Sequence, residues 1–243
     1  MTGMNDLKTT KGLYRIADLT VEAETFGRTL AQMQPYRTED SSPADIVIQS
    51  SWKWLQEKQP HLSPEDCEYL TSGWSFYNQL LDFDGMMLHA SAVVMDGRAY
   101  LFSAPCGTGK STHTSIWKRV FGDKVIMLND DKPALRCVDG TWYAYGTPWS
   151  GKHDYNTNMR APIAGICLLA RGTVNKIAPF GGVPAVCALM EQTSRSRNGG
   201  PNWAKIAAQL DALMQKVPVW RMECNMEDEA AILSHKVMSG EAE

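Results

Sequence analysis

Residues 103–112, Ser-Ala-Pro-Cys-Gly-Thr-Gly-Lys-Ser-Thr, constrain this chain more than any other stretch. The apolar run at residues 99–102 predicts a buried strand before them, and residues 112–121 predict a helix after them. A strand, a glycine-bearing loop and a helix opening with Lys-Ser are typical of loops that hold phosphate groups. Backbone N–H groups surround the phosphate oxygens, and the helix dipole adds attraction. The stretch predicts an anion site; the alternative is an ordinary tight turn.

Two side chains of this loop have specific expected contacts. Lys110 would reach the terminal phosphates of a nucleotide, and the Ser111 hydroxyl would ligate Mg²⁺. The strict pattern has Gly six residues before the Lys, where this chain has Ala104. The residues expected to bind the nucleotide are Pro105, Cys106, Gly107, Thr108, Gly109, Lys110, Ser111 and Thr112.

A histidine is expected beside this loop from hairpin spacing. Residues 86–94 predict a strand, and Asp96-Gly97 is a strong turn signal between this strand and the one that precedes the loop. With these two as turn residues, paired positions sum to 193, which places His89 opposite Ala104. A histidine in an apolar strand is usually a core residue, but this register favours a role in proton transfer or metal ligation.

Two acidic residues follow the next apolar run. Residues 125–128 predict a second buried strand, which ends in Asn129, Asp130 and Asp131. Carboxylates at the carboxyl end of such a strand face the phosphates in nucleotide sites and supply oxygen ligands to Mg²⁺. Adjacent strand residues point to opposite sides, so the two aspartates are expected to have different roles. The alternative is a turn, because Asn and Asp favour turns.

The remaining candidates lie in loops. Residues 146–156 are rich in glycine and polar groups and predict a substrate loop, with Lys152 meeting phosphate and His153 orienting an acceptor. A solvated loop is the alternative reading. Arg195 and Arg197 are further candidates for substrate contact, although solvated charges are the simpler interpretation.

Elements elsewhere are predicted from periodicity and turn signals. In the first third, Leu70, Trp74, Tyr77 and Leu81 are expected on the buried face of a helix that begins after Ser63. The other predicted strands are 13–22, 45–49, 134–138, 141–145, 163–170 and 217–224, and the other helices are 25–33, 183–192, 203–217 and 227–238. Residues 1–84 are therefore expected to form a small α+β part, and residues 85–243 the nucleotide-binding domain.

Net charge, cysteine spacing and the lack of long apolar runs limit the kinds of partner and compartment that are expected. The 243 residues carry a net charge of −3, which gives no general attraction to nucleic acid or to anionic membranes. The six cysteines form no C-x-x-C pair, so reduced thiols in a cytoplasmic protein are expected. The polar N-terminus has no signal-peptide core, and no apolar run approaches the length of a membrane span.

Three motifs together carry a family resemblance. Residues 104–112 resemble the loop G-x-S-G-x-G-K-[ST] of the HPr kinase and ATP-dependent phosphoenolpyruvate carboxykinase superfamily. Residues 89–92, His-Ala-Ser-Ala, look like the histidine-bearing strand before that loop in the carboxykinases, and residues 129–131 are similar to the paired aspartates after it. The likeness continues weakly to about residue 224 and leaves out residues 1–84. It implies an α/β fold: a mixed-sheet P-loop core of that type with flanking helices.

The resemblance implies a role for each matching residue. Lys110 and the amides of residues 107–112 would bind ATP phosphates, and Ser111 and Asp131 would hold Mg²⁺ or Mn²⁺. Asp130 would be the general base on an acceptor hydroxyl, and His89 would assist at the metal or at the transferred phosphoryl group.

The chain departs from the family pattern at two loop positions. Ala104 replaces the first glycine, which makes a strained backbone less accessible, and Cys106 replaces a serine hydroxyl. Capture of phosphate by backbone amides survives both changes.

The chain is too short for the additional domain that a carboxykinase needs. The resemblance therefore implies a Mg²⁺-dependent kinase that transfers the ATP γ-phosphoryl group to a hydroxyl, with a serine of a protein or biosynthetic peptide as the first expectation. HPr-kinase-like proteins often form oligomers, so a homo-oligomer is also implied. The alternatives are a non-catalytic nucleotide-binding module that delivers or senses a peptide, and a small-molecule kinase.

Overall fold

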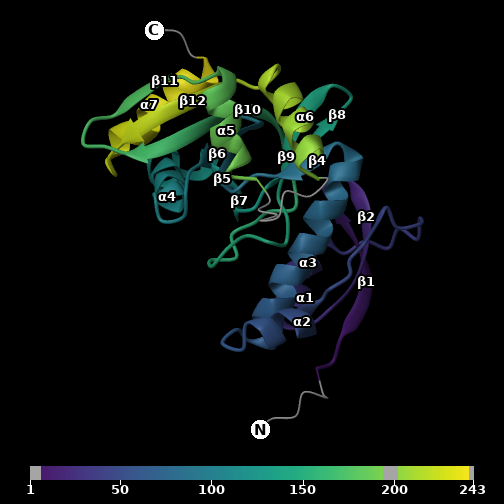
Figure 1. The fold of residues 1–243 in the computed structure, drawn as a ribbon. Helices are drawn as coiled ribbons and strands as arrows, with labels where there is room; N and C mark the ends of the chain where they lie inside the picture. Colours follow the sequence, from purple (N-terminus) through teal and green to yellow (C-terminus); the bar gives the residue numbers. More distant parts are fainter. Residues whose placement is uncertain (1–6, 194–201, 241–243) are drawn as a thin grey trace. The chain divides into compact units, whose positions relative to one another are not determined.

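The computed structural model describes residues 7–193 and 202–240, so Arg195 and Arg197 lie outside the described residues (Figure 1). The fold is mixed α/β and divides into two compact units, Met1–Leu80 and Leu81–Glu243. A search of the described residues for a helix long and apolar enough to cross a membrane finds none.

The first unit contains a three-stranded sheet in the order β1-β2-β3. Its elements are β1 (Thr10–Ile16), β2 (Leu19–Thr25), α1 (Gly27–Met33), η1 (Gln34–Tyr36), β3 (Ile46–Val47), α2 (Trp52–Lys58) and α3 (Pro64–Leu80). The single strand predicted for residues 13–22 is wrong, because a hairpin turn interrupts it. Ala17 and Asp18 form this turn with φ of 53° and 60°, a left-handed conformation that the residue types do not signal.

Helix α3 begins as the sequence predicts but buries another face. The Ser63 hydroxyl accepts a hydrogen bond from the Asp66 backbone N–H at 3.0 Å, which caps the helix. Trp74, expected in the core, is 47% exposed, and Leu70 is half-buried. Tyr77 is buried, as expected. The buried face of this helix comprises Cys67, Glu68, Tyr69, Thr71, Ser72, Gly73, Phe76, Tyr77 and Leu80.

A mixed sheet forms the centre of the second unit, in the order β4-β8-β9-β10-β6-β5-β7, with β12 also on β10 and β11 on β12. The strands are β4 (Gly85–Met87), β5 (Ala90–Met95), β6 (Arg98–Ser103), β7 (Ile126–Asp131), β8 (Ala134–Val138), β9 (Thr141–Tyr145), β10 (Arg160–Arg171), β11 (Lys176–Pro179) and β12 (Val219–Cys224). Strand β10 runs parallel to β6 and to β12, and the other pairs are antiparallel.

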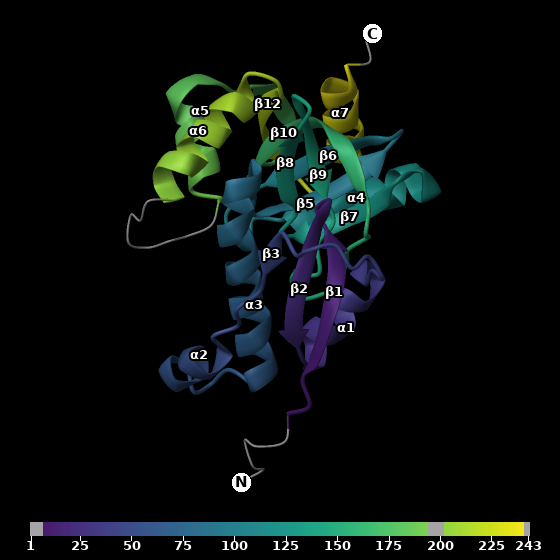
Figure 2. The ribbon, with the colours of Figure 1, turned by 90° about the vertical axis from the view of Figure 1, so that its right-hand side faces the viewer.

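Helices cover both faces of this sheet (Figure 2). They are α4 (Lys110–Phe121), α5 (Gly182–Met190), α6 (Asn202–Met214) and α7 (Asp228–Ser239), with the short turns η2 (Leu81–Phe83) and η3 (Gly122–Lys124). Helices α4 and α7 pack on one face, where Trp117 meets Tyr100 and Phe102. Helices α5 and α6 pack on the other, where Leu189 and Leu210 join the strand core. Strands β5, β6 and β10 therefore contribute alternate residues to the two cores.

The hairpin before the loop has the predicted register. Ala90 pairs with Ser103 and Met95 with Arg98, and the turn residues Asp96 and Gly97 have φ of 51° and 73°. The single strand expected over residues 86–94 is wrong, however. Its first part, β4, pairs with β8, while its second part, β5, pairs with β6 and β7. The break between β4 and β5 contains His89.

Strand β7 carries a bulge before its acidic end. Ala92 of β5 pairs with Asn129, whereas the next residue, Val93, pairs with Met127. Leu128 is therefore one extra residue on β7. The strand continues through Asn129 to Asp131, so these residues belong to the strand and do not form a turn after it.

Candidate functional site

Three strand ends bring the predicted residues to one edge of the sheet. Because β5 runs antiparallel to both β6 and β7, the carboxyl ends of β6 and β7 lie beside the amino end of β5. Ala90 pairs with Ser103 on one side and with Asp131 on the other. The loop after β6, the two aspartates of β7 and His89 before β5 are thus neighbours.

The loop between β6 and α4 leads directly into Lys110. Gly107 and Gly109 have φ of 78° and 120°, and a Cβ at either position would meet nothing within 4 Å. Conformation and not space therefore requires glycine there. Lys110 is 8% exposed, and its ammonium donates to the Ala104 carbonyl oxygen at 3.0 Å. Burial lowers the pKa of Lys110, and the charges of Asp131 and Asp130 oppose this effect.

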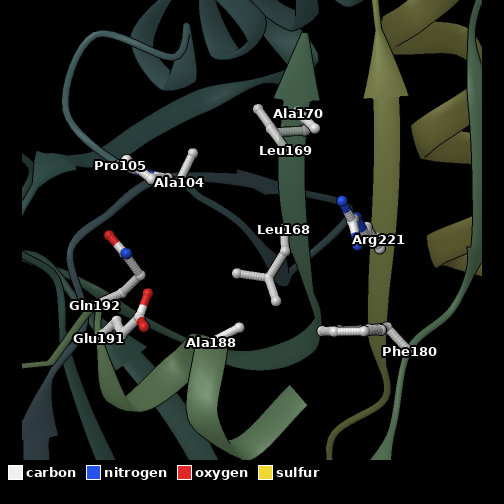
Figure 3. Close-up of a pocket in the computed structure, with 10 residues that line it drawn as sticks. All are labelled: Ala104, Pro105, Leu168, Leu169, Ala170, Phe180, Ala188, Glu191, Gln192 and Arg221. Carbon is white, nitrogen blue, oxygen red and sulfur yellow. The ribbon is translucent and has the colours of Figure 1, made fainter. Parts of the chain in front are cut away.

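A cavity of about 260 Å³ opens beside the first residues of the loop (Figure 3). Ala104 and Pro105 form one side of it, and Leu168 of β10 lies between them and β12. Gln192, just after α5, also lines this cavity.

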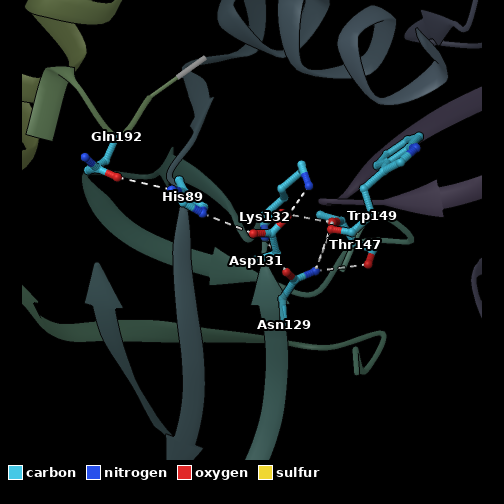
Figure 4. Close-up of polar contacts among 7 residues, drawn as sticks. All are labelled: His89, Asn129, Asp131, Lys132, Thr147, Trp149 and Gln192. Atoms are coloured by element: carbon cyan, nitrogen blue, oxygen red, sulfur yellow. Dashed lines mark hydrogen bonds and ion pairs between the residues drawn. The ribbon is translucent and has the colours of Figure 1, made fainter. Parts of the chain in front are cut away.

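A chain of polar contacts runs from Gln192 to Lys132 (Figure 4). His89 Nδ1 lies 3.1 Å from Gln192 Oε1, and His89 Nε2 lies 3.2 Å from Asp131 Oδ1. The Lys132 ammonium pairs with the second oxygen of Asp131. A doubly protonated imidazole would donate to both the amide oxygen and the carboxylate, whereas a singly protonated ring donates only one of the two bonds.

Asp131 is ionised and conformationally unusual. Burial alone would raise the pKa of this carboxyl, but the His89 hydrogen bond and the Lys132 charge together lower it well below its ordinary value. Its φ of 144° is one that residues with side chains rarely adopt. Such strain persists only where surrounding contacts impose it, and it clusters at functional sites. Asp130 and Asp131 occupy adjacent positions of β7, and the charges of both raise the pKa of Lys110; their expected difference in role stays a prediction.

A buried asparagine fixes the chain around the two aspartates. The Asn129 side chain donates to the Thr147 carbonyl oxygen at 3.1 Å and to its hydroxyl at 3.0 Å, and accepts from the Lys132 backbone N–H at 2.8 Å. Asp130 is 5% exposed, and its backbone N–H donates to the Tyr155 carbonyl oxygen at 2.9 Å. The loop after β9 is thereby attached to the end of β7.

The predicted substrate loop reaches the site through a glycine. A Cβ on Gly151 would lie 2.8 Å from the Asp130 carbonyl oxygen and 2.9 Å from the Asp131 Cβ. The next two residues, Lys152 and His153, are exposed, and the described contacts join neither side chain to Lys110. His153 stacks on Tyr155 instead, with ring centroids 5.6 Å apart.

Three contributors were not predicted from the sequence. Gln192 is 103 residues from His89, and Lys132 adjoins the acidic pair without any motif of its own. Arg171 ends β10, which is parallel to β6, and its guanidinium donates to the Gly107 carbonyl oxygen at 2.6 Å. The parallel arrangement of β10 and β6 would have been the signal for Arg171.

The donor set fits Mg²⁺ only together with phosphate. The described residues contain no group of three or more His, Cys, Asp and Glu side chains placed to hold a metal ion. Mg²⁺ usually needs only one or two carboxylates plus substrate phosphates and water, so Asp131 with the Ser111 hydroxyl would be a sufficient protein donor set. A cation at Asp131 would have to displace Lys132, which pairs with the same carboxylate.

Comparison with known proteins gives a distant structural similarity. No protein-family model matches the chain, and no curated protein matches it. Among solved structures, the HPr(Ser) kinase/phosphatase from Coxiella burnetii is similar over 62% of this chain and 96% of its own, with 10% identity and a TM-score of 0.34. A similarity at this level identifies neither a family nor an activity for the chain.

Proposed function

We propose that the protein is an ATP- and Mg²⁺-dependent kinase that phosphorylates a hydroxyl group, with a serine of a protein or peptide as the acceptor. The observation that carries this proposal is that the loop leading into Lys110 and the strand end bearing Asp130 and Asp131 flank the start of β5 at one sheet edge. A phosphate-binding loop alone would support only nucleotide binding. Carboxylates beside it add the groups that phosphoryl transfer needs.

The loop would hold the nucleotide through its backbone. Residues 107–112 bring N–H groups to the start of α4, whose dipole favours an anion. On binding, Lys110 would also donate to phosphate oxygens, because its ammonium has three protons and only one is used on the Ala104 carbonyl oxygen. Ser111 and Asp131 would hold Mg²⁺, which would neutralise charge on the phosphates.

Transfer requires the acceptor hydroxyl to lose its proton. The hydroxyl oxygen forms a bond to the γ-phosphorus while the bond from that phosphorus to the β–γ bridging oxygen breaks, and ADP leaves. The hydroxyl proton passes to the Asp130 carboxylate. His89, whose two ring nitrogens contact Gln192 and Asp131, would orient Asp131, and it would have to release one of these partners to donate to the transferred group.

The test compares Asp130→Asn with Lys110→Met. We expect D130N to bind Mg·ATP with nearly wild-type affinity by calorimetry and to lose roughly 10²–10⁴-fold in transfer rate, the usual contribution of a general base. K110M should weaken Mg·ATP binding itself. Asp123→Asn is a matched control, because Asp123 lies on η3 with a fully exposed side chain.

Full transfer by D130N would remove Asp130 from its assigned role. Binding of Mg·ATP by the wild-type chain without turnover in the presence of serine peptides would instead favour the non-catalytic module. No heat on mixing the folded wild-type chain with Mg·ATP would contradict both.

A further inference from the structure

The cavity beside the loop, here named the loop-side pocket, combines an apolar floor with separated polar groups (Figure 3). Its apolar lining comes from the first loop residues, from β10, from Phe180 just after β11 and from α5. The polar side chains are Glu191, Gln192 and Arg221. Figure 3 shows Arg221 on the β12 side of the pocket and Glu191 on the opposite side, below Ala104 and Pro105.

Arg221 brings an unused positive charge to this pocket. In the part of the chain that the structure describes, its guanidinium has no hydrogen-bond or ion-pair partner, and its side chain is exposed. Gln192 differs, since it is 4% exposed and contacts His89. The pocket is therefore connected at one wall to the polar chain that leads to Asp131, and at the other offers a guanidinium suited to a carboxylate.

The lysine of the loop indicates which end of a bound nucleotide faces the pocket. In loops of this kind the lysine reaches the terminal phosphates, while the amides toward the helix hold the inner ones. Here the Lys110 ammonium lies on the Ala104 carbonyl oxygen, and Ala104 lines the pocket. A nucleotide bound in this way would place its terminal phosphoryl group near the wall of the pocket that Ala104 forms.

The size of the pocket fits part of a ligand. Sites that enclose a whole small molecule have volumes of roughly 300–1,000 Å³, and about 260 Å³ lies below that range. One apolar side chain fits inside this volume with room to spare, and a purine ring would fit as well, so the assignment to the acceptor rests on the placement of Arg221 and of Lys110.

We propose that the loop-side pocket binds the acceptor: it takes an apolar side chain close to the reacting hydroxyl, and Arg221 pairs with an acidic group of the same peptide. This assignment rests on the proposed kinase function and specifies its substrate. The acceptor is then a peptide segment in which an apolar residue and an acidic residue flank the hydroxyl-bearing residue.

The test uses the full chain, Mg·ATP and a library of peptides with a central serine flanked by randomised positions. We expect wild-type product to be enriched in Leu, Met or Phe and in Asp or Glu at flanking positions. Ala188→Phe fills the pocket from α5 and should raise KM for the selected peptide about tenfold or more, as expected when an apolar side chain is no longer buried. Arg221→Glu should abolish the acidic preference.

Matched controls separate the pocket from general effects. Val183→Phe adds the same ring to α5 at a residue that is 75% exposed and outside the pocket lining, and should leave KM unchanged. Lys216→Glu makes the same charge change at an exposed residue outside the lining, and should keep the acidic preference. All four variants should bind Mg·ATP like the wild type.

Three results would overturn the assignment. If A188F weakens Mg·ATP binding tenfold while V183F does not, the pocket holds part of the nucleotide. Phosphorylated peptides whose flanking preferences survive A188F and R221E contradict the pocket assignment alone. If the wild-type chain binds Mg·ATP but forms no phosphopeptide, peptide phosphorylation fails, and the role of the pocket fails with it.

Discussion

Replacing Glu68 with glutamine should change how the stability of the first unit depends on pH. Glu68 of α3 is 1% exposed, and neither of its carboxylate oxygens has a hydrogen-bond partner in the described structure. Burial raises the pKa of Glu68 from 4.5 to about 7, and the charge of Glu65 adds to the rise. The Thr29 hydroxyl lies outside hydrogen-bonding geometry, and its effect in lowering the pKa is larger than the rise due to Glu65 but smaller than the effect of burial.

The magnitude follows from the two pKa values. A carboxyl whose pKa is higher in the folded state is stabilising in its protonated form, so its contribution is fully present below pH 4.5 and is lost as pH rises through 7. A difference of about 2.5 pH units corresponds to about 3 kcal/mol, since each unit is worth 1.36 kcal/mol. Glutamine has the shape of the protonated acid but does not ionise. E68Q should therefore be more stable than the wild type at pH 8 by up to about 3 kcal/mol, and nearly equal to it at pH 4.5.

Hydrogen exchange of the α3 amides, measured on the full chain at several pH values, gives the local free energy of opening. The difference between E68Q and wild type isolates Glu68 from other titrating groups, and the amides of α4 in the second unit serve as an internal control. A difference that does not grow between pH 4.5 and 8 would refute the reasoning, because Glu68 would then ionise as an exposed acid.

Two further outcomes are expected in the second unit. Gly151→Ala should lower the free energy of unfolding by about 1–3 kcal/mol and weaken Mg·ATP binding. Gly151 has a φ of 78°, and the new Cβ would press on Asp130 and Asp131. An unchanged melting temperature and unchanged binding by calorimetry would contradict the close packing. Burial lowers the pKa of His113 from 6.5 to about 4, so the stability that its neutral form supplies above pH 6.5 should be lost as pH falls toward 4. Hydrogen exchange of the α4 amides should report this loss of stability at low pH. His113→Gln keeps a polar partner for Ser234 and should remove the pH dependence. An equally steep loss of stability in H113Q would exclude His113 as the cause.

The hairpins of the second unit could be predicted because their turns have a chemical signature. Asp-Gly occurs at both Asp96 and Asp139, and both turns have positive φ at the two central residues. The turn at Ala17 and Asp18 adopts the same backbone sign without glycine, so the surrounding strands impose it and the residue types give no signal.

The candidate site was predictable where residues are close in sequence to the loop. Lys110 and the two aspartates fall on consecutive elements, so the order of strand, helix and strand places them together. Gln192 reaches His89 only through the tertiary fold, and the break in the strand before β5 depends on which neighbours β4 and β5 each pair with. Periodicity within a single stretch contains neither kind of information.

The extra residue of β7 leaves the pairing with β5 intact on both sides of the bulge. Val93 pairs with Met127 and Ala92 with Asn129, so Leu128 is the residue without a partner on β5. A chain lacking Leu128 would keep Asp130 opposite Ser91 and Asp131 opposite Ala90, and would lose only the local bend of the strand. The acidic end of this strand is thus tolerant of a one-codon deletion at the bulge, whereas loss of Asp130 itself would move Asp131 to the other face.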